Sequence, residues 1–253
     1  MDRLRFIEHA KPKLRNPIFV EGLPGIGHVG KLAAQHLVDA SKATRWLTIH
    51  SSDFPPQVAV GEDGVLRLLR AELWTIPAAG TARPLVVMTG DAQPLTSHGQ
   101  TELVEAVLDR IEPLGCKELY TLGGYGTGTR VERPEVLAAA TDKATASKLR
   151  KMGLKLPGDE SPGGGIIGAS GLFLGLGALR GMNGACLMGE TNGYLVDPKA
   201  ARAVLDSLSK VLGRAIDTKD LEKSAGELDR ITSQLSEALA APAPREATDH
   251  YIG

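Results

Sequence analysis

The chain has 253 residues, of which 42% are hydrophobic and 23% are charged, and its formal net charge at pH 7 is -1. This composition is ordinary for a soluble globular protein with one large domain or two small ones. The near-zero charge argues against partners such as nucleic acid or an acidic membrane surface. The first residues, Met1–Arg5, lack the apolar core of a signal peptide, so we expect a cytoplasmic protein. Cys116 and Cys186 lie in or beside apolar runs, which favours buried, reduced thiols over a disulfide.

In chain order, the first clear element is the apolar run Ile18–Val20, which predicts a buried strand. A glycine-rich turn follows it directly. Apolar residues then recur at helical spacing between Val29 and Leu37. The first unit of the fold is therefore a strand, a tight turn and a helix.

The next stretch predicts several strands. Arg45–His50 reads as a strand, and Val58–Val60 with Val65–Leu69 reads as a hairpin, with Asp63–Gly64 in its turn. Leu73–Pro77 is predicted to add an edge strand, because proline ends it.

A second strand and helix follow. Leu85–Thr89 is an unbroken apolar run and predicts a buried strand. Ser97 and Gln100 form a capping-box pattern at the start of a helix whose apolar stripe reaches Ile111. Glu118–Leu122 is predicted to be the next strand, and it leads into a second glycine-rich segment.

The third quarter of the chain predicts a strand over Val136–Ala140 and a basic helix over Lys143–Met152. Gly163–Leu179 is uncharged and apolar, but it is too short and too rich in glycine for a membrane span. We expect a helix there that presses against another backbone in the core through small residues. A last buried strand is predicted over Ala185–Met188. The small residues of the expected helix are Gly164, Gly168, Gly171 and Gly175.

The C-terminal part predicts two helices and a tail. Asp197 is expected to cap the first helix, with Pro198 in its first turn. The second, Lys219–Ala240, carries leucines every seven residues, which favours docking on the domain or on another subunit. The repeating leucines are Leu221, Leu228 and Leu235.

Strands that alternate with helices predict an α/β fold with a central, mostly parallel sheet flanked by helices. We expect an α/β domain over residues 1–216, an amphipathic helix over 217–241 and a flexible tail over 242–253.

The glycines of the first turn, Gly25, Gly27 and Gly30, match the G-x-G-x-x-G pattern of dinucleotide-binding proteins. Asp53, just past the second strand, lies near the place where such proteins hold a ribose. The same glycines equally suit a tight turn that joins strand to helix, and we favour this structural interpretation. Gly30–Lys31 is not part of a P-loop, because Leu32 stands where a hydroxyl would have to reach magnesium.

Two further segments could hold a ligand. Gly123–Gly128, which includes Gly124 and Gly126, could form an anion-binding nest of amides or a flexible surface loop. Glu190 follows the last predicted strand and could bind a sugar hydroxyl, cap a loop or pair with an arginine.

No other set of residues points to catalysis. The six histidines have no metal-binding spacing, and Ser170 does not stand in a G-x-S-x-G motif. We therefore expect no metal, no cofactor and no catalytic residue.

Four motifs in a fixed order resemble the archaeal branch of the proteasome assembly chaperone family, the branch related to the second eukaryotic assembly-chaperone subunit. The resemblance covers most of the chain, from Pro17 to Gly213. It implies a fold similar to nucleoside phosphorylases without their activity, and homo-oligomers that bind the α-ring of the proteasome core particle. The motifs are Gly22–Gly30, Gly123–Gly128, Gly189–Thr191 and Asp197–Pro198.

The same resemblance implies a role for the C-terminus, because a terminal hydrophobic-tyrosine-any tripeptide in this family enters pockets between α-subunits. This chain ends in Tyr251, Ile252 and Gly253, so its tyrosine stands one position earlier than the pattern requires. These three residues are the predicted partner-binding residues.

The sequence is compatible with three functions. The first is a non-catalytic oligomeric binder of proteasome α-subunits. The second is an enzyme of the nucleoside phosphorylase or nucleosidase kind, which would need a pocket that joins Glu190 to Gly123–Gly128. The third is a dinucleotide-binding oxidoreductase built on Gly25, Gly27, Gly30 and Asp53.

Overall fold

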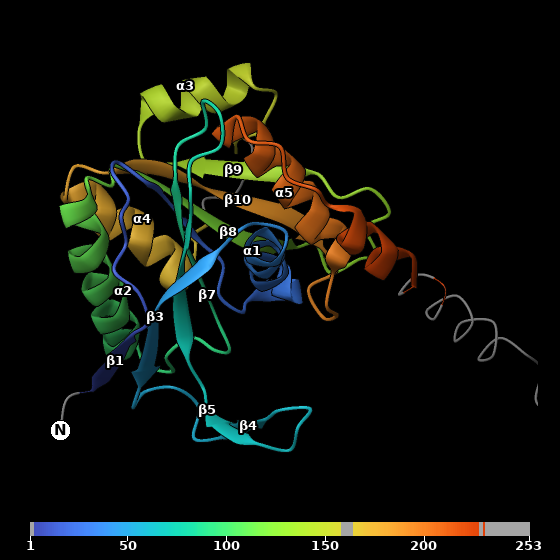
Figure 1. The fold of residues 1–253 in the computed structure, drawn as a ribbon. Coiled ribbons are helices and arrows are strands. Elements are labelled where there is room, and N and C mark those ends of the chain that lie inside the picture. Colours follow the sequence, from blue (N-terminus) through green and yellow to red (C-terminus); the bar gives the residue numbers. More distant parts are fainter. Residues whose placement is uncertain (1–2, 158–163, 228–229, 231–253) are drawn as a thin grey trace, which may run out of the picture.

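The computed structural model describes residues 3–157, 164–227 and 230. An eight-stranded sheet in the order β1-β3-β6-β7-β2-β8-β10-β9 runs through the middle of this region (Figure 1). Its strands are β1 (Leu4–Glu8), β2 (Ile18–Glu21), β3 (Thr44–Ser51), β6 (Ala71–Ile76), β7 (Leu85–Gly90), β8 (Glu118–Gly126), β9 (Val136–Ala140) and β10 (Asn183–Thr191).

The centre of the sheet is parallel, as the alternation of strands and helices predicts. β7, β2, β8 and β10 are neighbours that pair in parallel, whereas β1, β3 and β6 on one side and β9 on the other pair antiparallel. The carboxyl ends of the four parallel strands therefore meet at one end of the molecule, where α/β proteins place their ligand sites.

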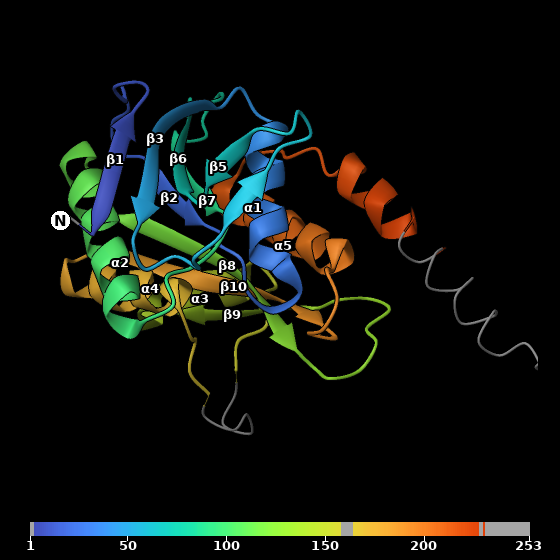
Figure 2. The ribbon, with the colours of Figure 1, turned by 90° about the horizontal axis from the view of Figure 1, so that it is seen from below.

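Helices cover both faces of the sheet, which gives three layers (Figures 1 and 2). One face carries α2 and α4 over a core that includes Phe19 and Phe173, whose ring centroids are 4.9 Å apart. The opposite face carries α1, α3 and α5 over a second core cluster that includes Tyr120. The helices are α1 (Val29–Asp39), α2 (Ser97–Ile111), α3 (Lys143–Lys151), α4 (Ala169–Leu179) and α5 (Pro198–Leu212).

Local sequence signals explain the start of α5. Asp197 is its N-cap, and its carboxylate accepts a hydrogen bond from the backbone N–H of Ala200 at 2.9 Å. Pro198 occupies the first turn, where no N–H donor is needed. The apolar residues that repeat along the helix are buried and form part of the second core cluster: Ala201, Val204, Leu205, Leu208 and Leu212.

Two sequence predictions about element boundaries are wrong. The strand predicted at an edge, β6, lies inside the sheet between β3 and β7, and Pro77 follows its last residue, where the ladder needs no further N–H. The cap of α2 is Thr96 rather than Ser97, because the hydroxyl of Thr96 accepts from the N–H of Gly99 at 3.0 Å.

The prediction of a glycine stripe over Gly163–Leu179 is also wrong, because the glycine that packs against the sheet is not one of those it names. α4 begins only at Ala169, and Gly175 on it is exposed, with open space beside it. The glycine that faces the sheet is Gly177, where a Cβ would lie 2.3 Å from Cδ1 of Leu119. Close approach of α4 to β8 therefore depends on one glycine and not on a repeated pattern.

The predicted hairpin forms a separate two-stranded sheet of β4 (Val58–Val60) and β5 (Leu66–Leu68), which projects from the domain (Figure 1). Gly64 in its turn has a φ of 76°, as the Asp63–Gly64 pair predicts.

The beginning of the second C-terminal helix is helical over 219–227, where Leu221 and Ala225 are buried. The other leucines of its predicted repeat, Leu228 and Leu235, lie outside the described residues.

Candidate functional site

The glycine-rich turn lies at the carboxyl end of β2, in the centre of the sheet. It contains a short 3-10 turn over Ile26–His28 that leads into α1. Gly27 and His28 have φ angles of 60° and 51°, in the left-handed region. A histidine there is uncommon and glycine is the usual choice, so the turn is conformationally demanding.

Close packing explains two glycines of this turn. A Cβ on Gly30 would lie 2.1 Å from the carbonyl oxygen of Leu122 in β8, and one on Gly22 would lie 2.1 Å from the carbonyl oxygen of Gly30. Real Cβ atoms do not approach backbone so closely, so these glycines let α1 press against the sheet. Gly25 is different, because the nearest atom to its Cβ position is Nε2 of Gln93, 4.0 Å away.

The second glycine segment is mostly strand, because β8 continues to Gly126 whereas the sequence predicted an end at Leu122. Gly124 and Gly126 stand opposite Gly189 and Thr191 of β10. The turn packs onto them: a Cβ on Gly124 would lie 2.4 Å from the carbonyl oxygen of Ile26. The structure thus brings the two glycine segments together, and Ile26 fills the space that a phosphate nest at Gly124 and Gly126 would need.

Glu190 lies next to this junction, on β10. Its Oε2 accepts a hydrogen bond from the backbone N–H of Glu135 at 3.2 Å, and its own N–H donates to the carbonyl of Glu135 at 2.9 Å. Both contacts hold the segment before β9 against β10. Of the roles predicted for Glu190, its geometry favours the structural one.

Asp53 is far from the glycine turn in the sheet. It follows β3, and β6 and β7 separate β3 from β2. Its Oδ2 accepts hydrogen bonds from the N–H and the hydroxyl of Thr96, both at 2.9 Å, and so holds the start of α2. The oxidoreductase hypothesis requires Asp53 to lie beside the glycine turn, and the structure does not bring the two together.

Glu21, the last residue of β2, is fully buried at this end of the sheet. Of the acids there, it has the most strongly shifted pKa. One carboxylate oxygen accepts from the N–H of Leu23 at 2.8 Å, and the other accepts from the hydroxyl of Ser170 on α4 at 2.8 Å. Burial raises the pKa of Glu21 to about 7, although both hydrogen bonds lower it. Neither donor carries a charge, so the ionised form has no charged hydrogen-bond partner.

Lys31, a half-buried cation, also lies close to the turn. Its Nζ donates to Oε1 of Gln35 at 3.0 Å and to the hydroxyl of Thr89 at 3.3 Å. Burial lowers its pKa, against the opposing effect of Asp91 and other acids. Its hydrogen bonds join α1 to β7 rather than reaching toward an open ligand site.

Exposed apolar side chains cover this end of the molecule. In the loop that joins β10 to α5, Tyr194, Leu195 and Val196 are half-exposed or more. Asp197 at the end of that loop donates its N–H to the carbonyl of Gly27 at 2.9 Å. A Cβ on Gly193 would lie 3.7 Å from Cγ2 of Ile26, so loop and turn are in contact. We call these side chains the apolar rim: Ile26, Tyr125, Tyr194, Leu195 and Val196.

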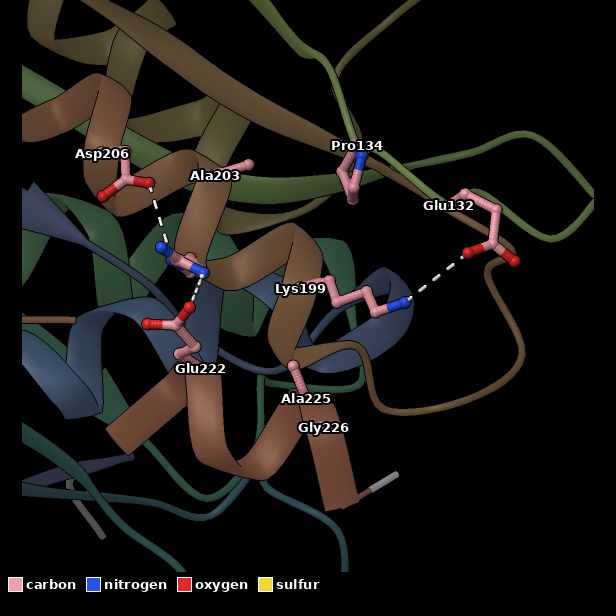
Figure 3. A pocket seen from close by; sticks show the side chains of 9 residues that line it. Glu132, Pro134, Lys199, Ala203, Asp206, Glu222, Ala225 and Gly226 are labelled. Carbon is pink, nitrogen blue, oxygen red and sulfur yellow. Dashed lines mark ion pairs between the residues drawn. The ribbon is translucent and has the colours of Figure 1, made fainter. Parts of the chain in front are cut away.

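A cavity of about 430 Å³ lies between α5 and the beginning of the C-terminal helix (Figure 3). Charged side chains line it and pair across it: Nη1 of Arg202 lies 3.1 Å from Oε1 of Glu222, and Nζ of Lys199 lies 4.0 Å from Oε2 of Glu132. The lining contains no histidine, cysteine or serine. The Arg202–Glu222 pair joins the beginning of the C-terminal helix to α5, and the Lys199–Glu132 pair joins α5 to the loop between β8 and β9.

Several sequence predictions concern residues beyond the reach of the structure. Tyr251, Ile252 and Gly253 lie outside the described residues, so their predicted role stays a prediction.

Across 3–157, 164–227 and 230, no three histidine, cysteine or acidic side chains gather as a metal site would require. None of the helices described is both long and apolar enough to cross a bilayer.

Sequence reasoning missed Glu21 and the apolar rim. A glutamate that directly follows the apolar run Ile18–Val20 was a signal for a buried acid. Three consecutive apolar residues between Gly193 and the cap Asp197 were a signal for an exposed apolar loop, since connecting segments run over the protein surface.

Comparison with known proteins agrees with the fold. An uncharacterised protein of Methanocaldococcus jannaschii is 40% identical over 247 residues, which cover 95% of this chain and 93% of the relative. The crystal structure of Pyrococcus furiosus PbaB, described as an archaeal proteasome activator, matches with a TM-score of 0.87 and 38% identity, over 93% of this chain and all of that one. P. furiosus PbaA, described as an archaeal homologue of proteasome-assembly chaperone, matches with a TM-score of 0.75 and 26% identity, over 94% and 95%.

These matches confirm the resemblance to archaeal proteasome assembly chaperone homologues that the four ordered motifs indicate. The model of the PAC2 family matches residues 19–236, which is most of the chain. The glycine turn, the β8–β10 junction, α5 and the beginning of the C-terminal helix all lie within that range. The chain is a member of the PAC2 family.

Proposed function

We propose that this protein is a non-catalytic, homo-oligomeric binder of proteasome core-particle α-subunits in the cytoplasm, with a role like that of a proteasome assembly chaperone. Membership of the PAC2 family and the similarity to PbaA support a chaperone-like role. The α-subunits as partner and the self-association are our proposal.

The observation that carries this proposal is the character of the carboxyl end of the parallel strands. An α/β enzyme keeps a polar cleft there. In this chain the two glycine segments pack against each other through Ile26, and the apolar rim is exposed above them. Exposed apolar side chains grouped in this way mark a protein-binding surface.

The C-terminus supplies a second proposed contact. We propose that Tyr251, Ile252 and Gly253 enter a pocket on the α-subunits, where the terminal carboxylate can meet a lysine or backbone amides. The tail and the apolar rim would then act together, and losing either would weaken binding without abolishing it.

The test is a binding measurement with purified α-subunits. We expect the full chain to bind, and a chain that ends at Pro244 to bind on the order of tenfold more weakly, because it lacks the terminal tripeptide. The double variant Tyr194→Ser/Leu195→Ser should also bind more weakly. Leu179→Ser is its matched control, since Leu179 is 84% exposed on α4, outside the apolar rim.

The outcomes separate the parts of the proposal. If neither the full nor the shortened chain binds, the proposed function is wrong. If both bind equally well, only the role of the tail is wrong. If Leu179→Ser weakens binding as much as the rim variant does, the rim is not the contact surface.

A second candidate function is activation of the assembled proteasome, which the similarity to PbaB favours. An activator and an assembly chaperone can bind the same α-subunits, so binding alone does not separate them. Adding the full chain to assembled core particles and following peptide hydrolysis would do so. An activator raises the rate several-fold, whereas an assembly chaperone leaves it unchanged and speeds ring formation from free subunits.

A further inference from the structure

A second cavity lies at the other end of the parallel strands from the apolar rim. It is bounded by the beginning of α3, the amino ends of β8 and β10, and the segment that precedes β7. Its volume is about 320 Å³. This size is at the lower end of the range of small-molecule sites, so the cavity fits a ligand of metabolite size.

Hydrogen bonds fix the wall that α3 contributes. The hydroxyl of Thr141 accepts from the N–H of Gly184 on β10 at 2.9 Å, and the N–H of Thr141 donates back to the carbonyl of Gly184 at 2.9 Å. Asp142 is the N-cap of α3, and its carboxylate accepts from the N–H of Thr145 at 2.8 Å. The beginning of α3 is therefore anchored to β10, and the cavity is part of the folded frame.

Tyr120 of β8 lines the cavity from the core side. It is only 2% exposed, and its ring belongs to the second core cluster. Within the described residues its hydroxyl has no hydrogen-bond partner, yet the hydroxyl is not sealed from solvent in the core. A phenylalanine would fill the same core position, so the packing does not explain the hydroxyl. An unpartnered donor on a buried side chain indicates a ligand in the cavity.

The hydroxyl of Tyr120 is kept in its neutral form. Burial raises the pKa of Tyr120, and the nearby charge of Glu118 acts in the same direction, against a smaller opposing effect of Arg83. The hydroxyl therefore holds its proton at neutral pH and can donate it in a hydrogen bond.

Arg83 and Glu118 satisfy each other at the edge of the cavity. Nη1 of Arg83 lies 3.2 Å from Oε2 of Glu118, and Nε and Nη2 of Arg83 donate to the carbonyl of Asn16 at 3.0 and 2.9 Å. All three nitrogens of the guanidinium are thus engaged by protein groups. Arg83 is not available to a ligand, and it neutralises the acid of the lining.

Two lysines of the lining are left without a hydrogen bond. Nζ of Lys148 on α3 lies 4.0 Å from Oε1 of Glu118, which is too long for a hydrogen bond. Nζ of Lys117, just before β8, has neither an ion pair nor a hydrogen bond in the part of the chain that the structure describes. Both side chains are exposed, so their amino groups can turn toward the cavity. The lining therefore holds more positive than negative charge.

We propose that this cavity binds the phosphate group of a small molecule, with the hydroxyl of Tyr120 as the buried donor and Lys117 and Lys148 as the countercharges. Lysine offers donors only, and the one acid of the lining is already paired, so the ligand must supply acceptor oxygens. The site lies at the amino ends of the strands, so it is independent of the proposed contact with α-subunits.

The charges favour phosphate over carboxylate. A phosphate monoester carries about -1.5 to -2 at pH 7, which matches two lysines, whereas a carboxylate carries a single charge. Lysine binds phosphate as a point charge. The planar fork that recognises a carboxylate in a bidentate way belongs to arginine, and Arg83 is already engaged.

The first experiment titrates inorganic phosphate into the full chain in a calorimeter, with sodium chloride holding the ionic strength constant. We expect saturable binding with one phosphate per chain. Tyr120→Phe keeps the ring in the core and removes only the hydroxyl, so it should fold like the wild type and bind phosphate on the order of tenfold more weakly. Thermal unfolding without phosphate checks the fold of the variant.

The second experiment tests the lysines with a control on the same helix. Lys117→Gln and Lys148→Gln should each weaken binding of inorganic phosphate several-fold, because each removes one countercharge. Lys151→Gln removes the same charge from α3 at an exposed position outside the lining, and it should bind phosphate like the wild type.

Four results would overturn the phosphate site. They are no saturable heat with the wild type, equal binding by Tyr120→Phe and the wild type, an equal loss in Lys151→Gln and Lys148→Gln, and acetate that binds as tightly as phosphate at the same ionic strength. The last result would assign the cavity to carboxylates. Binding of α-subunits is measured without phosphate, so a failure of either proposal leaves the other standing.

Discussion

The carboxylate of Glu21 accepts a hydrogen bond from the hydroxyl of Ser170, which lies 149 residues later in the chain and 2.8 Å away. The contact ties the end of β2, in the centre of the sheet, to α4 on one of its faces. It also places an ionisable group in the core with neutral donors only, so its protonation must be linked to the stability of the fold.

The first prediction is a pH-dependent stability that depends on Glu21. Burial raises its pKa from 4.5 to about 7 in the folded state, so the folded state binds the proton more tightly than the unfolded one. Stability should therefore fall as the pH rises from about 4.5 to 7, and stay level above, with a total loss of about 3 kcal/mol. Glu21→Gln, which has no charge to bury, should remove this loss. Urea unfolding at several pH values measures it.

A control variant tests the sign of this effect. Ser170→Ala removes a hydrogen bond that lowers the pKa of Glu21, so it should destabilise the protein more at pH 8 than at pH 4.5. If Glu21→Gln is equally destabilising at both pH values, the carboxylate is not protonated on folding as we expect.

The second prediction separates packing from ligand binding in the glycine turn. Gly30→Ala forces a Cβ to within 2.1 Å of the carbonyl oxygen of Leu122, whereas Gly25→Ala meets nothing closer than 4.0 Å. We expect Gly30→Ala to lose about 2 kcal/mol of unfolding free energy and Gly25→Ala to change it by less than about 0.5 kcal/mol. Denaturant titrations give both values. Equal effects would mean that Gly30 is not packed against the backbone of β8.

A comparison of the predicted with the observed helices and strands shows which structural features short stretches of sequence encode. Buried strands such as β7 follow from unbroken apolar runs, and the start of α5 follows from the Asp197 cap, because each signal lies within a few residues. The order of the strands was not accessible in this way. β6 was predicted at an edge from Pro77 alone, but its neighbours are set by pairing with β3 and β7, which no local pattern encodes.

The same distinction between local and long-range features applies to the candidate site. The first glycine segment was recognised as a turn, and the preference for a structural role there is consistent with the contact between Gly124 and Ile26. The second segment was predicted as an anion-binding nest or a surface loop, and most of it is strand. The pairing of Glu21 with Ser170 was missed, because it joins residues far apart in sequence whose types are common. The direction of the hairpin was missed for a related reason: a period-two pattern defines two faces, and the Arg67–Asp91 contact decides which one faces the domain.

The third prediction concerns the two cysteines. Burial raises the pKa of Cys116 to about 11 and that of Cys186 to about 12, so neither forms thiolate at neutral pH. We expect neither thiol to react with a thiol reagent at pH 8 in the native protein, and both to react after unfolding in guanidinium chloride. Fast labelling of one thiol in the native state would show that its region opens more readily than this packing implies.

The last prediction concerns the link between hairpin and domain. Burial acts to raise the pKa of Asp91, but hydrogen bonds from Arg67 and from the N–H of Arg70 outweigh it and keep the pKa below its usual value. The contact therefore stabilises the hairpin above the ordinary pKa of an aspartate and is lost as the pH falls through the lowered value.

Asp91→Asn should free the hairpin at neutral pH, because an amide cannot make the charge-assisted bidentate contact. We expect the amides of β4 and β5 to exchange with deuterium on the order of tenfold faster in this variant, while those of β7 and β8 stay protected. Glu62→Gln is the control, since it removes an exposed acid from the tip without touching the base. Unchanged exchange in Asp91→Asn would show that the packing of Ala59, and not the ion pair, holds the hairpin on the domain.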